Sequence, residues 1–159
     1  MHLGGSCHCG AVGFSVEAYA PVPYMRCYCS ICRKTAGGGG YAVNLGADAA
    51  SLSVRGREAI SVFHARVDGR ESPAERRFCS HCGTALWVFD PDHPDLVHPF
   101  ASAIDTPLPE PPEQLHIMLR SKANWVRVDA RPGEAQYEMF PPESLEAWHR
   151  RQGLLDGGA

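Results

Sequence analysis

Seven cysteines, arranged in three short groups, are the residues of this chain best suited to chemistry. The first group is CHCG at residues 7–10, the second is CYCSICRK at 27–34, and the third is CSHCG at 79–83. Thiolates are common zinc ligands, and a CxxCG turn lets two of them face one ion while its glycine permits the turn. Because disulfides alone cannot use an odd number of cysteines, metal binding is the first interpretation.

The three groups divide most simply into one complete and one incomplete zinc site. The third group needs two further ligands, which either the first group or part of the second could supply. Pairing the first with the third gives a closed four-thiolate site and leaves three thiolates in the second. Structural zinc sites are closed, whereas catalytic ones keep an open position. The pattern therefore predicts two zinc ions, one structural at Cys7, Cys9, Cys79 and Cys82, and one catalytic at Cys27, Cys29 and Cys32.

Two other uses of these thiols remain open at this point. Both zinc ions could be structural, with the second group completed by one of His8, His64, His81 or His116. Alternatively, Cys29 with Cys32, or Cys79 with Cys82, could form a CxxC redox couple. The redox interpretation is the weaker one, because neither pair lies at a convincing strand-to-helix junction of the predicted elements.

Several familiar zinc chemistries do not fit the sequence. His93 and His98 follow Cys79 and Cys82 at nearly zinc-finger spacing, but a proline comes directly after each histidine and excludes the required helix. Neither HxE nor HExxH occurs, so water activation lacks its usual general base. An open three-thiolate site is better suited to a soft ligand: the metal would deprotonate an incoming thiol, which adds to a carbonyl carbon, or would polarise an aldehyde oxygen.

Cations flank the thiol groups and would favour their ionised state. Arg26, Arg33 and Lys34 bracket the second group, and Arg76 and Arg77 precede the third. A solvated charged surface is the alternative interpretation for each of them.

Composition indicates one cytoplasmic domain. The chain has 159 residues and a mass of 17.3 kDa, and we expect a single zinc-binding domain over 1–159 with its core at about 6–128. The net charge of -3 disfavours nucleic-acid binding, because an acidic surface repels polyanions. The N-terminus shows no secretory pattern, and no apolar run approaches the roughly 20 residues that span a bilayer, so we expect no membrane partner.

The elements that must position the cysteines are predicted to be short antiparallel strands. The 16 glycines and 13 prolines indicate many turns. Two proline-rich segments, 90–99 and 106–114, are expected to form neither a helix nor a central strand. Only residues 141–153 have helix start and stop signals in the right order. Apolar alternation predicts strands at 11–16, 40–45, 51–54, 60–65, 85–89, 115–119 and 125–128.

The motifs GSCHCGAV, CYCSICRK and RFCSHCGTALW, in this order, resemble those of the glutathione-dependent formaldehyde-activating enzymes, a broad zinc-binding family that includes centromere protein V. The resemblance extends from about Ser6 to Trp125. It implies an Mss4-like β-tent around two zinc sites with the ligand division given above. It also implies a carbon–sulfur lyase that condenses glutathione, as co-substrate, with formaldehyde. Position 28 is Tyr where the family usually has His, so a proton relay through that His is absent.

The resemblance leads to one enzymatic prediction and one rival. We expect a zinc-dependent lyase that joins glutathione, or a similar thiol, to formaldehyde or another small aldehyde; the rival is a non-catalytic zinc-binding structural or interaction module. Glutathione contacts are predicted at Gly38, Gly39, Lys122 and Trp125. The alternatives are a mobile glycine turn, a surface lysine and a buried core tryptophan.

Overall fold

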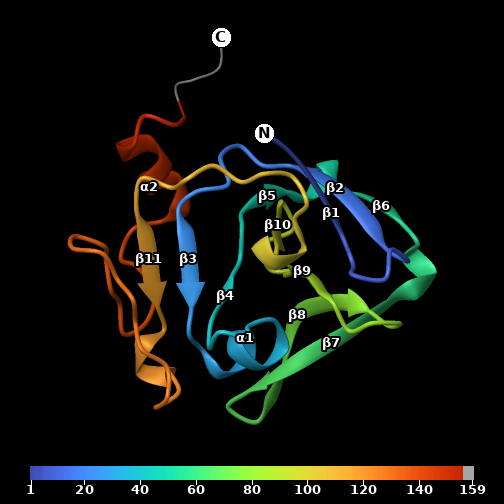
Figure 1. Cartoon of the computed structure of the whole chain (residues 1–159), viewed down its shortest axis with the longest axis horizontal. Coiled ribbons are helices and arrows are strands. Elements are labelled where there is room, and N and C mark those ends of the chain that lie inside the picture. Colours follow the sequence, from blue (N-terminus) through green and yellow to red (C-terminus); the bar gives the residue numbers. More distant parts are fainter. Residues whose placement is uncertain (156–159) are drawn as a thin grey trace.

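The computed structural model describes residues 1–155, so residues 156–159 of the predicted domain lie outside it. It is mainly β, as predicted, and its strands form three sheets (Figure 1). The first has the order β1 (His2–Ser6), β2 (Gly13–Glu17), β6 (Ser53–Arg55). The second has the order β5 (Ala47–Asp48), β10 (Leu96–Pro99), β9 (Ala85–Phe89), β8 (Arg70–Cys79), β7 (Ile60–Val67). The third has the order β11 (Gln114–Ile117), β3 (Tyr24–Cys27), β4 (Ala42–Val43).

Helices are short and few in the described part of the chain. The α-helices are α1 (Ser30–Thr35) and α2 (Leu145–Arg151), and the 3₁₀ turns are Ala49–Ser51, Arg57–Ala59, Ala101–Ala103 and Leu119–Ser121. Ser144 caps the N-terminus of α2 by accepting a hydrogen bond from the Ala147 N–H at 3.1 Å. Within residues 1–155, no helix has the length and apolar character needed to cross a membrane.

The sheet pairing corrects one feature of the prediction. The strands are antiparallel except β3 and β11, which run parallel with Cys27 opposite Ile117. A parallel pair needs a crossover connection. Here the chain between β3 and β11 forms most of the other two sheets. Local alternation in the sequence does not show that two segments so far apart pair in parallel. In Figure 1, β3 and β11 lie side by side, with α1 at the lower end of β3.

The main core forms between the first and second sheets. The predicted alternation in residues 11–16 is confirmed, because Val12, Phe14 and Val16 are all buried. Phe14 meets Trp87 of β9 edge to face, with ring centroids 5.2 Å apart. A second buried cluster surrounds the central thiol group and includes Phe100, Leu115 and Ile117 beside Cys27 and Cys32.

Two of the sequence predictions are wrong, and one helix was missed. Residues 90–99 were not expected to hold a central strand, yet β10 lies between β5 and β9. The sheet tolerates Pro99 because it is the last residue of β10 and lies beyond the two residues that pair with β5. Residues 125–128 form a turn and irregular chain instead of a strand. Helix α1 was missed, since its six residues are too short for a helical period to be recognised.

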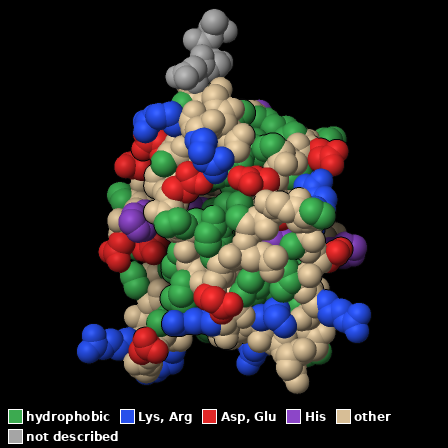
Figure 2. Space-filling view, turned by 90° about the vertical axis from the view of Figure 1, so that its left-hand side faces the viewer, with side chains coloured by type: hydrophobic (Ala, Val, Ile, Leu, Met, Phe, Trp, Pro, Cys, Tyr) green, Lys and Arg blue, Asp and Glu red, His purple; other side chains and the backbone are tan. Residues whose placement is uncertain are grey.

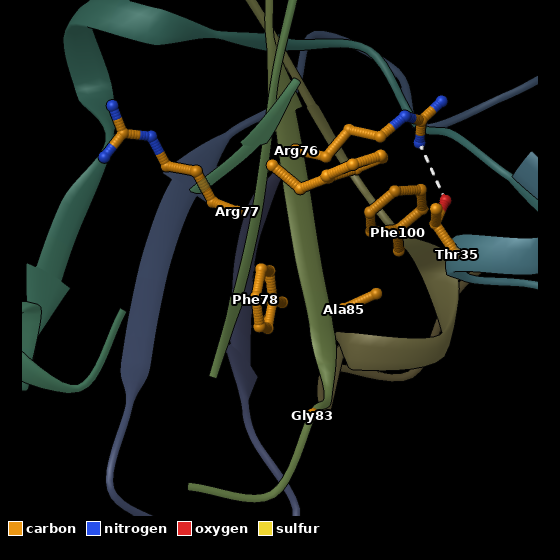
Figure 3. A pocket seen from close by; sticks show the side chains of 8 residues that line it. Thr35, Arg76, Arg77, Phe78, Gly83, Ala85 and Phe100 are labelled. Atoms are coloured by element: carbon orange, nitrogen blue, oxygen red, sulfur yellow. Dashed lines mark hydrogen bonds between the residues drawn. The ribbon is translucent and has the colours of Figure 1, made fainter. Parts of the chain in front are cut away.

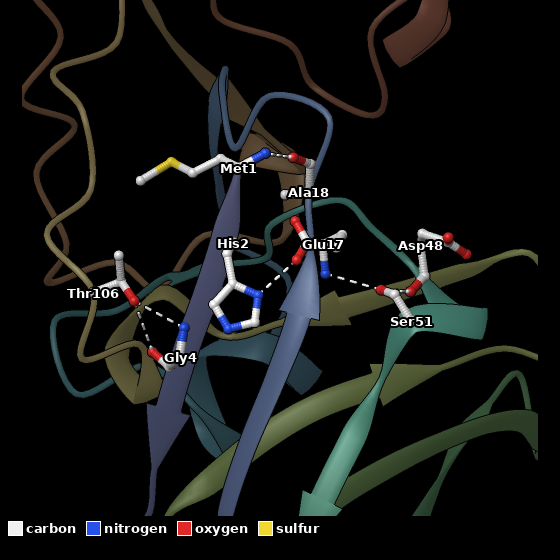
Figure 4. Close-up of polar contacts among 8 residues, drawn as sticks. All are labelled: Met1, His2, Gly4, Glu17, Ala18, Asp48, Ser51 and Thr106. Atoms are coloured by element: carbon white, nitrogen blue, oxygen red, sulfur yellow. Dashed lines mark hydrogen bonds and ion pairs between the residues drawn. The ribbon is translucent and has the colours of Figure 1, made fainter.

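The first strand is fixed along its length by polar contacts (Figure 4). The Met1 ammonium donates to the Ala18 carbonyl at 2.5 Å, and the Gly4 N–H donates to the Thr106 hydroxyl at 2.8 Å. His2 Nδ1 and Glu17 Oε1 are 2.6 Å apart across the β1–β2 pair. These contacts hold β1 in register and so fix the turn that follows it, which carries the first two cysteines.

Candidate metal centres and the adjoining cavity

The structure brings the first and third cysteine groups together at two neighbouring hairpin turns. Cys7 and Cys9 lie between β1 and β2, whereas Cys79 ends β8 and Cys82 lies in the turn before β9. All four Sγ atoms lie within 4.8 Å of one another, with Cys7 to Cys9 at 3.5 Å and Cys9 to Cys79 at 3.8 Å. Tetrahedral coordination with Zn–S bonds of about 2.3 Å places sulfurs about 3.8 Å apart. The four-thiol group therefore fits a closed zinc site.

The two turns share a backbone arrangement that explains their glycines. Gly10 donates to the Cys7 carbonyl at 3.0 Å, and Gly83 donates to the Cys79 carbonyl at 2.8 Å. Both glycines have positive φ, at 77° and 74°, which a residue with a Cβ adopts only with strain. The predicted role of glycine in these turns is confirmed.

Local hydrogen bonds favour the thiolate at Cys82 and Cys7 of the four-thiol group, whereas contact with the neighbouring thiols raises the pKa of Cys9 to about 12. The Thr84 hydroxyl lies 3.1 Å from Cys82 Sγ and, with the Thr84 backbone N–H, lowers the pKa of Cys82 to about 5. Burial acts to raise the pKa of Cys7, but the Val12 N–H at 3.2 Å and the neighbouring thiols outweigh it, so the pKa is lowered. Ionised sulfurs are the species that bind metal.

The second group, called here the trio, is Cys27, Cys29 and Cys32, and its Sγ atoms also lie within 4.8 Å of one another. Cys27 ends β3, and Cys29 is the N-cap of α1, accepting the Cys32 N–H at 3.3 Å. Helix α1 thus folds the sequence back so that Cys32 joins the other two. Cys27 and Cys32 are buried, and Cys29 is partly exposed.

Arg76 provides the charge that faces the trio. Its Nη2 donates to Cys32 Sγ at 3.3 Å, and its Nη1 donates to the Thr35 hydroxyl at 3.3 Å. Hydrogen bonds from the Cys27 and Cys29 thiols, reinforced by Arg76, lower the pKa of Cys32 to about 2. Sharing a proton with its neighbours correspondingly raises the pKa of Cys27. Among the three thiols, the hydrogen bonds and Arg76 thus favour ionisation at Cys32.

The other predicted cations have different positions. Arg26 lies over the Tyr41 ring, 4.9 Å from its centroid, and Arg77 pairs with Glu75. The Nε of Arg33 is buried without a hydrogen-bond partner in residues 1–155. Arg76, which the sequence placed beside the four-thiol group, belongs to the trio instead.

Asn44 was missed by the sequence reasoning. Its Nδ2 donates to Cys32 Sγ at 3.7 Å, while its Oδ1 is buried and has no hydrogen-bond partner in the described chain. Asn44 follows β4, next to β3 in the third sheet. No spacing in the sequence distinguishes it from a surface amide.

The structure also bears on the alternatives for the trio. Among residues 1–155, no histidine nitrogen or carboxylate joins the three sulfurs within 4.8 Å. His116, one of the candidates, instead contacts Tyr28 and Glu134. The redox alternative gains one feature, because Cys29 does lie at a strand-to-helix junction, between β3 and α1. The expectation that no CxxC pair lies at such a junction is therefore wrong. The junction was not predicted because the six residues of α1 are too few to show a helical period.

Tyr28, between two trio cysteines, is fully buried. Its hydroxyl lies 3.0 Å from Nδ1 of His116, whose Nε2 lies 3.4 Å from Glu134 Oε2. Burial lowers the pKa of His116, so the neutral ring accepts from Tyr28 and donates to Glu134. Burial acts to raise the pKa of Glu134, but hydrogen bonds from Arg131 and His116 outweigh it and lower the pKa to about 2.

The predicted glutathione contacts lie in two adjoining segments. Gly38 and Gly39 are exposed, and a Cβ placed on the next residue, Gly40, would lie 3.2 Å from the Trp125 ring. Trp125 is 64% exposed, so the buried-core alternative for it is wrong. The Lys122 ammonium donates to the Val126 and Ala123 carbonyls at 2.7 and 3.2 Å. Glutathione contact at these four residues stays a prediction.

A cavity of about 400 Å³ lies near the trio, although none of the three trio cysteines lines it (Figure 3). Arg76 and Thr35, which form a hydrogen bond with each other, connect it to Cys32. None of the four predicted glutathione contacts lines it. Its lining residues are Thr35, Phe63, Arg76, Arg77, Phe78, Gly83, Ala85 and Phe100.

Charged side chains do not form a large basic surface on the face shown in Figure 2. Lys and Arg lie close to Asp and Glu around an apolar centre. This distribution agrees with the acidic net charge of -3.

Comparison with known proteins relates these features to a family. The family model described as "Glutathione-dependent formaldehyde-activating enzyme" matches residues 2–121. A protein of Halomonas elongata is 57% identical over 157 residues, covering 99% of this chain and 100% of its own, and bears the name "Putative glutathione-dependent formaldehyde-activating enzyme". A crystal structure of a Rhodobacter sphaeroides protein is similar in fold, with a TM-score of 0.52, 23% identity, and coverage of 84% of this chain and 98% of that one. This chain therefore belongs to the glutathione-dependent formaldehyde-activating enzyme family.

Proposed function

We propose that this protein is a zinc-dependent carbon–sulfur lyase that adds glutathione, or a similar thiol, to formaldehyde or another small aldehyde. The observation that carries the proposal is the trio: three sulfurs within 4.8 Å of one another, with no fourth protein ligand among residues 1–155, beside a cavity. Family membership supports the same reaction. In it, the thiol sulfur bonds to the carbonyl carbon, and the thiol proton ends on the carbonyl oxygen.

The trio would hold a zinc ion, since its three thiols match the soft donors that zinc prefers. A bound zinc ion would lower the pKa of an incoming thiol or polarise a carbonyl oxygen. Arg76 and Asn44 stabilise the ionised form of Cys32 through their hydrogen bonds to its sulfur.

The four-thiol group would hold the structural zinc ion. It joins two turns that are far apart in sequence, at 7–9 and 79–82, so its metal would stabilise the fold. Reduced thiols at both groups fit a cytoplasmic location. The single zinc-binding domain over residues 1–159 remains part of this proposal.

Zinc content is the first test. Elemental analysis of reduced protein, purified without chelator, should give close to two zinc ions per chain. The second test is the exchange of glutathione with formaldehyde, followed by NMR exchange spectroscopy. Wild type should accelerate the exchange, Cys29→Ser should abolish the acceleration, and Ser30→Ala, an exposed neighbour, should retain it.

The rival function, a non-catalytic zinc-binding module, predicts a different result. Wild type and Cys29→Ser would then exchange the adduct at equal rates, both matching the protein-free reaction. Circular dichroism of each variant establishes that loss of exchange does not come from loss of folding.

A further inference from the structure

The walls of the cavity beside the trio are mostly apolar and come from separate elements. Phe63 lies on β7, Phe78 on β8 and Ala85 on β9, while Phe100 precedes the 3₁₀ turn at 101–103. In the sheet, Phe63 lies opposite Arg76, and Phe78 lies opposite Ala85. Arg77 reaches away from Phe100 in Figure 3 and pairs with Glu75.

One wall of this cavity is formed by Arg76, which contacts the trio. Arg76 spans from Thr35 to Cys32, with both hydrogen bonds at 3.3 Å, and its guanidinium carbon lies 6.0 Å from the centroid of Phe100. Phe100 also belongs to the buried cluster that contains Cys27 and Cys32. A molecule in the cavity would therefore contact Arg76, the side chain hydrogen-bonded to Cys32, while the rest of it packs against aromatic walls.

The volume and chemistry of the cavity fit neither formaldehyde nor the body of glutathione. Formaldehyde has one carbon atom and would leave most of the roughly 400 Å³ unfilled. Glutathione carries two carboxylates, an ammonium and amides, and burying such groups without partners is unfavourable. By contrast, an apolar cavity of about 150 Å³ already accommodates benzene.

We propose that this cavity binds the organic group of an apolar, aryl-sized aldehyde, so that the enzyme accepts bulky aldehydes in addition to formaldehyde. The inference rests on the proposed function and names its substrate class. The reaction balances without a further reactant: sulfur bonds to the carbonyl carbon, the carbonyl π electrons move to oxygen, and oxygen takes the thiol proton. The aldehyde's apolar group is stabilised in the cavity because its apolar surface is removed from water.

Phe63 is the residue of the cavity best suited to test this specificity. It is 46% exposed, so truncating it removes little from the core of the protein. Its neighbour Val62 is 42% exposed on the same strand but does not line the cavity, which makes Val62→Ala a matched control. The two variants remove apolar surface from adjacent positions of β7, and only one changes the cavity.

The experiment compares phenylacetaldehyde with formaldehyde as partners of glutathione in zinc-loaded protein. We expect wild type to accelerate exchange of both adducts. Phe63→Ala should lower the ratio of kcat/KM for phenylacetaldehyde to that for formaldehyde about tenfold, the order expected when an apolar contact is lost. Val62→Ala should leave the ratio unchanged. A second readout, free of turnover, is binding of 2-phenylethanol followed by ligand-observed NMR, which Phe63→Ala should weaken.

The outcomes separate the two proposals. Acceleration with formaldehyde but not with phenylacetaldehyde, or an unchanged ratio in Phe63→Ala, overturns the substrate assignment and leaves the proposed function standing. No acceleration with either aldehyde overturns the proposed function and the substrate assignment with it. Binding of 2-phenylethanol that is insensitive to Phe63→Ala shows that the probe binds elsewhere and also counts against the cavity as the aldehyde site.

Discussion

Replacing Arg76 by Met should weaken zinc binding at the trio while leaving the four-thiol group intact. Methionine retains an apolar side chain of similar reach but lacks the guanidinium that donates to Cys32 Sγ at 3.3 Å. A hydrogen bond involving a charged group contributes about 1.5–3 kcal/mol. Since about 1.4 kcal/mol is a factor of ten, the expected loss of zinc affinity is about 10- to 100-fold. Removing a group that hydrogen-bonds a metal ligand typically lowers metal affinity by the same factor, about 10- to 100-fold.

The assay is a competition between the protein and a chromophoric chelator. Wild type should release two zinc ions, and Arg76→Met should release one of them at a chelator concentration about 10- to 100-fold lower. Arg77→Met is the matched control, because Arg77 is the next residue along β8 and pairs with Glu75. If Arg76→Met held both zinc ions as tightly as wild type does, the role of the guanidinium would be refuted. If both zinc ions were released at a similarly lowered chelator concentration, the substitution would have destabilised the whole protein instead.

Three further predictions concern stability. Cys79→Ser should unfold or strongly destabilise the protein, because the zinc ion proposed for the four-thiol group would stabilise the fold; an unchanged melting temperature would contradict that assignment. Glu134 has its pKa lowered from 4.5 to about 2, so its ionised form stabilises the fold above pH 4.5, and this contribution disappears as the pH falls towards 2. The free energy of unfolding of wild type, measured with denaturant, should therefore exceed that of Glu134→Gln by less and less as the pH falls from 4.5 towards 2. A difference that stays constant with pH would argue against the ion pair of Glu134 with Arg131. Tyr28→Phe should lower the free energy of unfolding by about 1 kcal/mol, because buried His116 Nδ1 loses its donor; no shift in the urea midpoint would count against this bond.

Local sequence patterns were enough to predict the cysteine groups and several strands. The alternation at 11–16 reflects burial of Val12, Phe14 and Val16 against the main core, which the structure confirms. The strand predicted at 85–89 is also present, but Leu86 and Trp87 are both buried, so burial does not alternate along it. The need for glycine in the two hairpin turns could also be predicted, because the positive φ of Gly10 and Gly83 is a local requirement of each turn.

Elements whose structure depends on residues distant in the sequence could not be predicted from local patterns. Strand β10 is central because β5, which precedes it by about a third of the chain, pairs with it, and its Pro99 is tolerated only because that pairing ends at Val97. Helix α1 forms around the cap at Cys29, and six residues carry no measurable helical period.

The position of Arg76 shows how a local rule can be informative and still incomplete. Successive side chains of a strand face opposite sides, so residues three apart, such as Arg76 and Cys79, point to different faces. The regular pairing of this part of β8 with β7, where Phe63 lies opposite Arg76 and Ile60 opposite Cys79, preserves that alternation. The alternation separates Arg76 from the four-thiol group once β8 is known to be a strand, and the sequence patterns predicted no strand at residues 70–79. Its actual partner, Cys32, required knowing that α1 packs beside the other face of β8, and that same packing creates the cavity for which the substrate class is proposed.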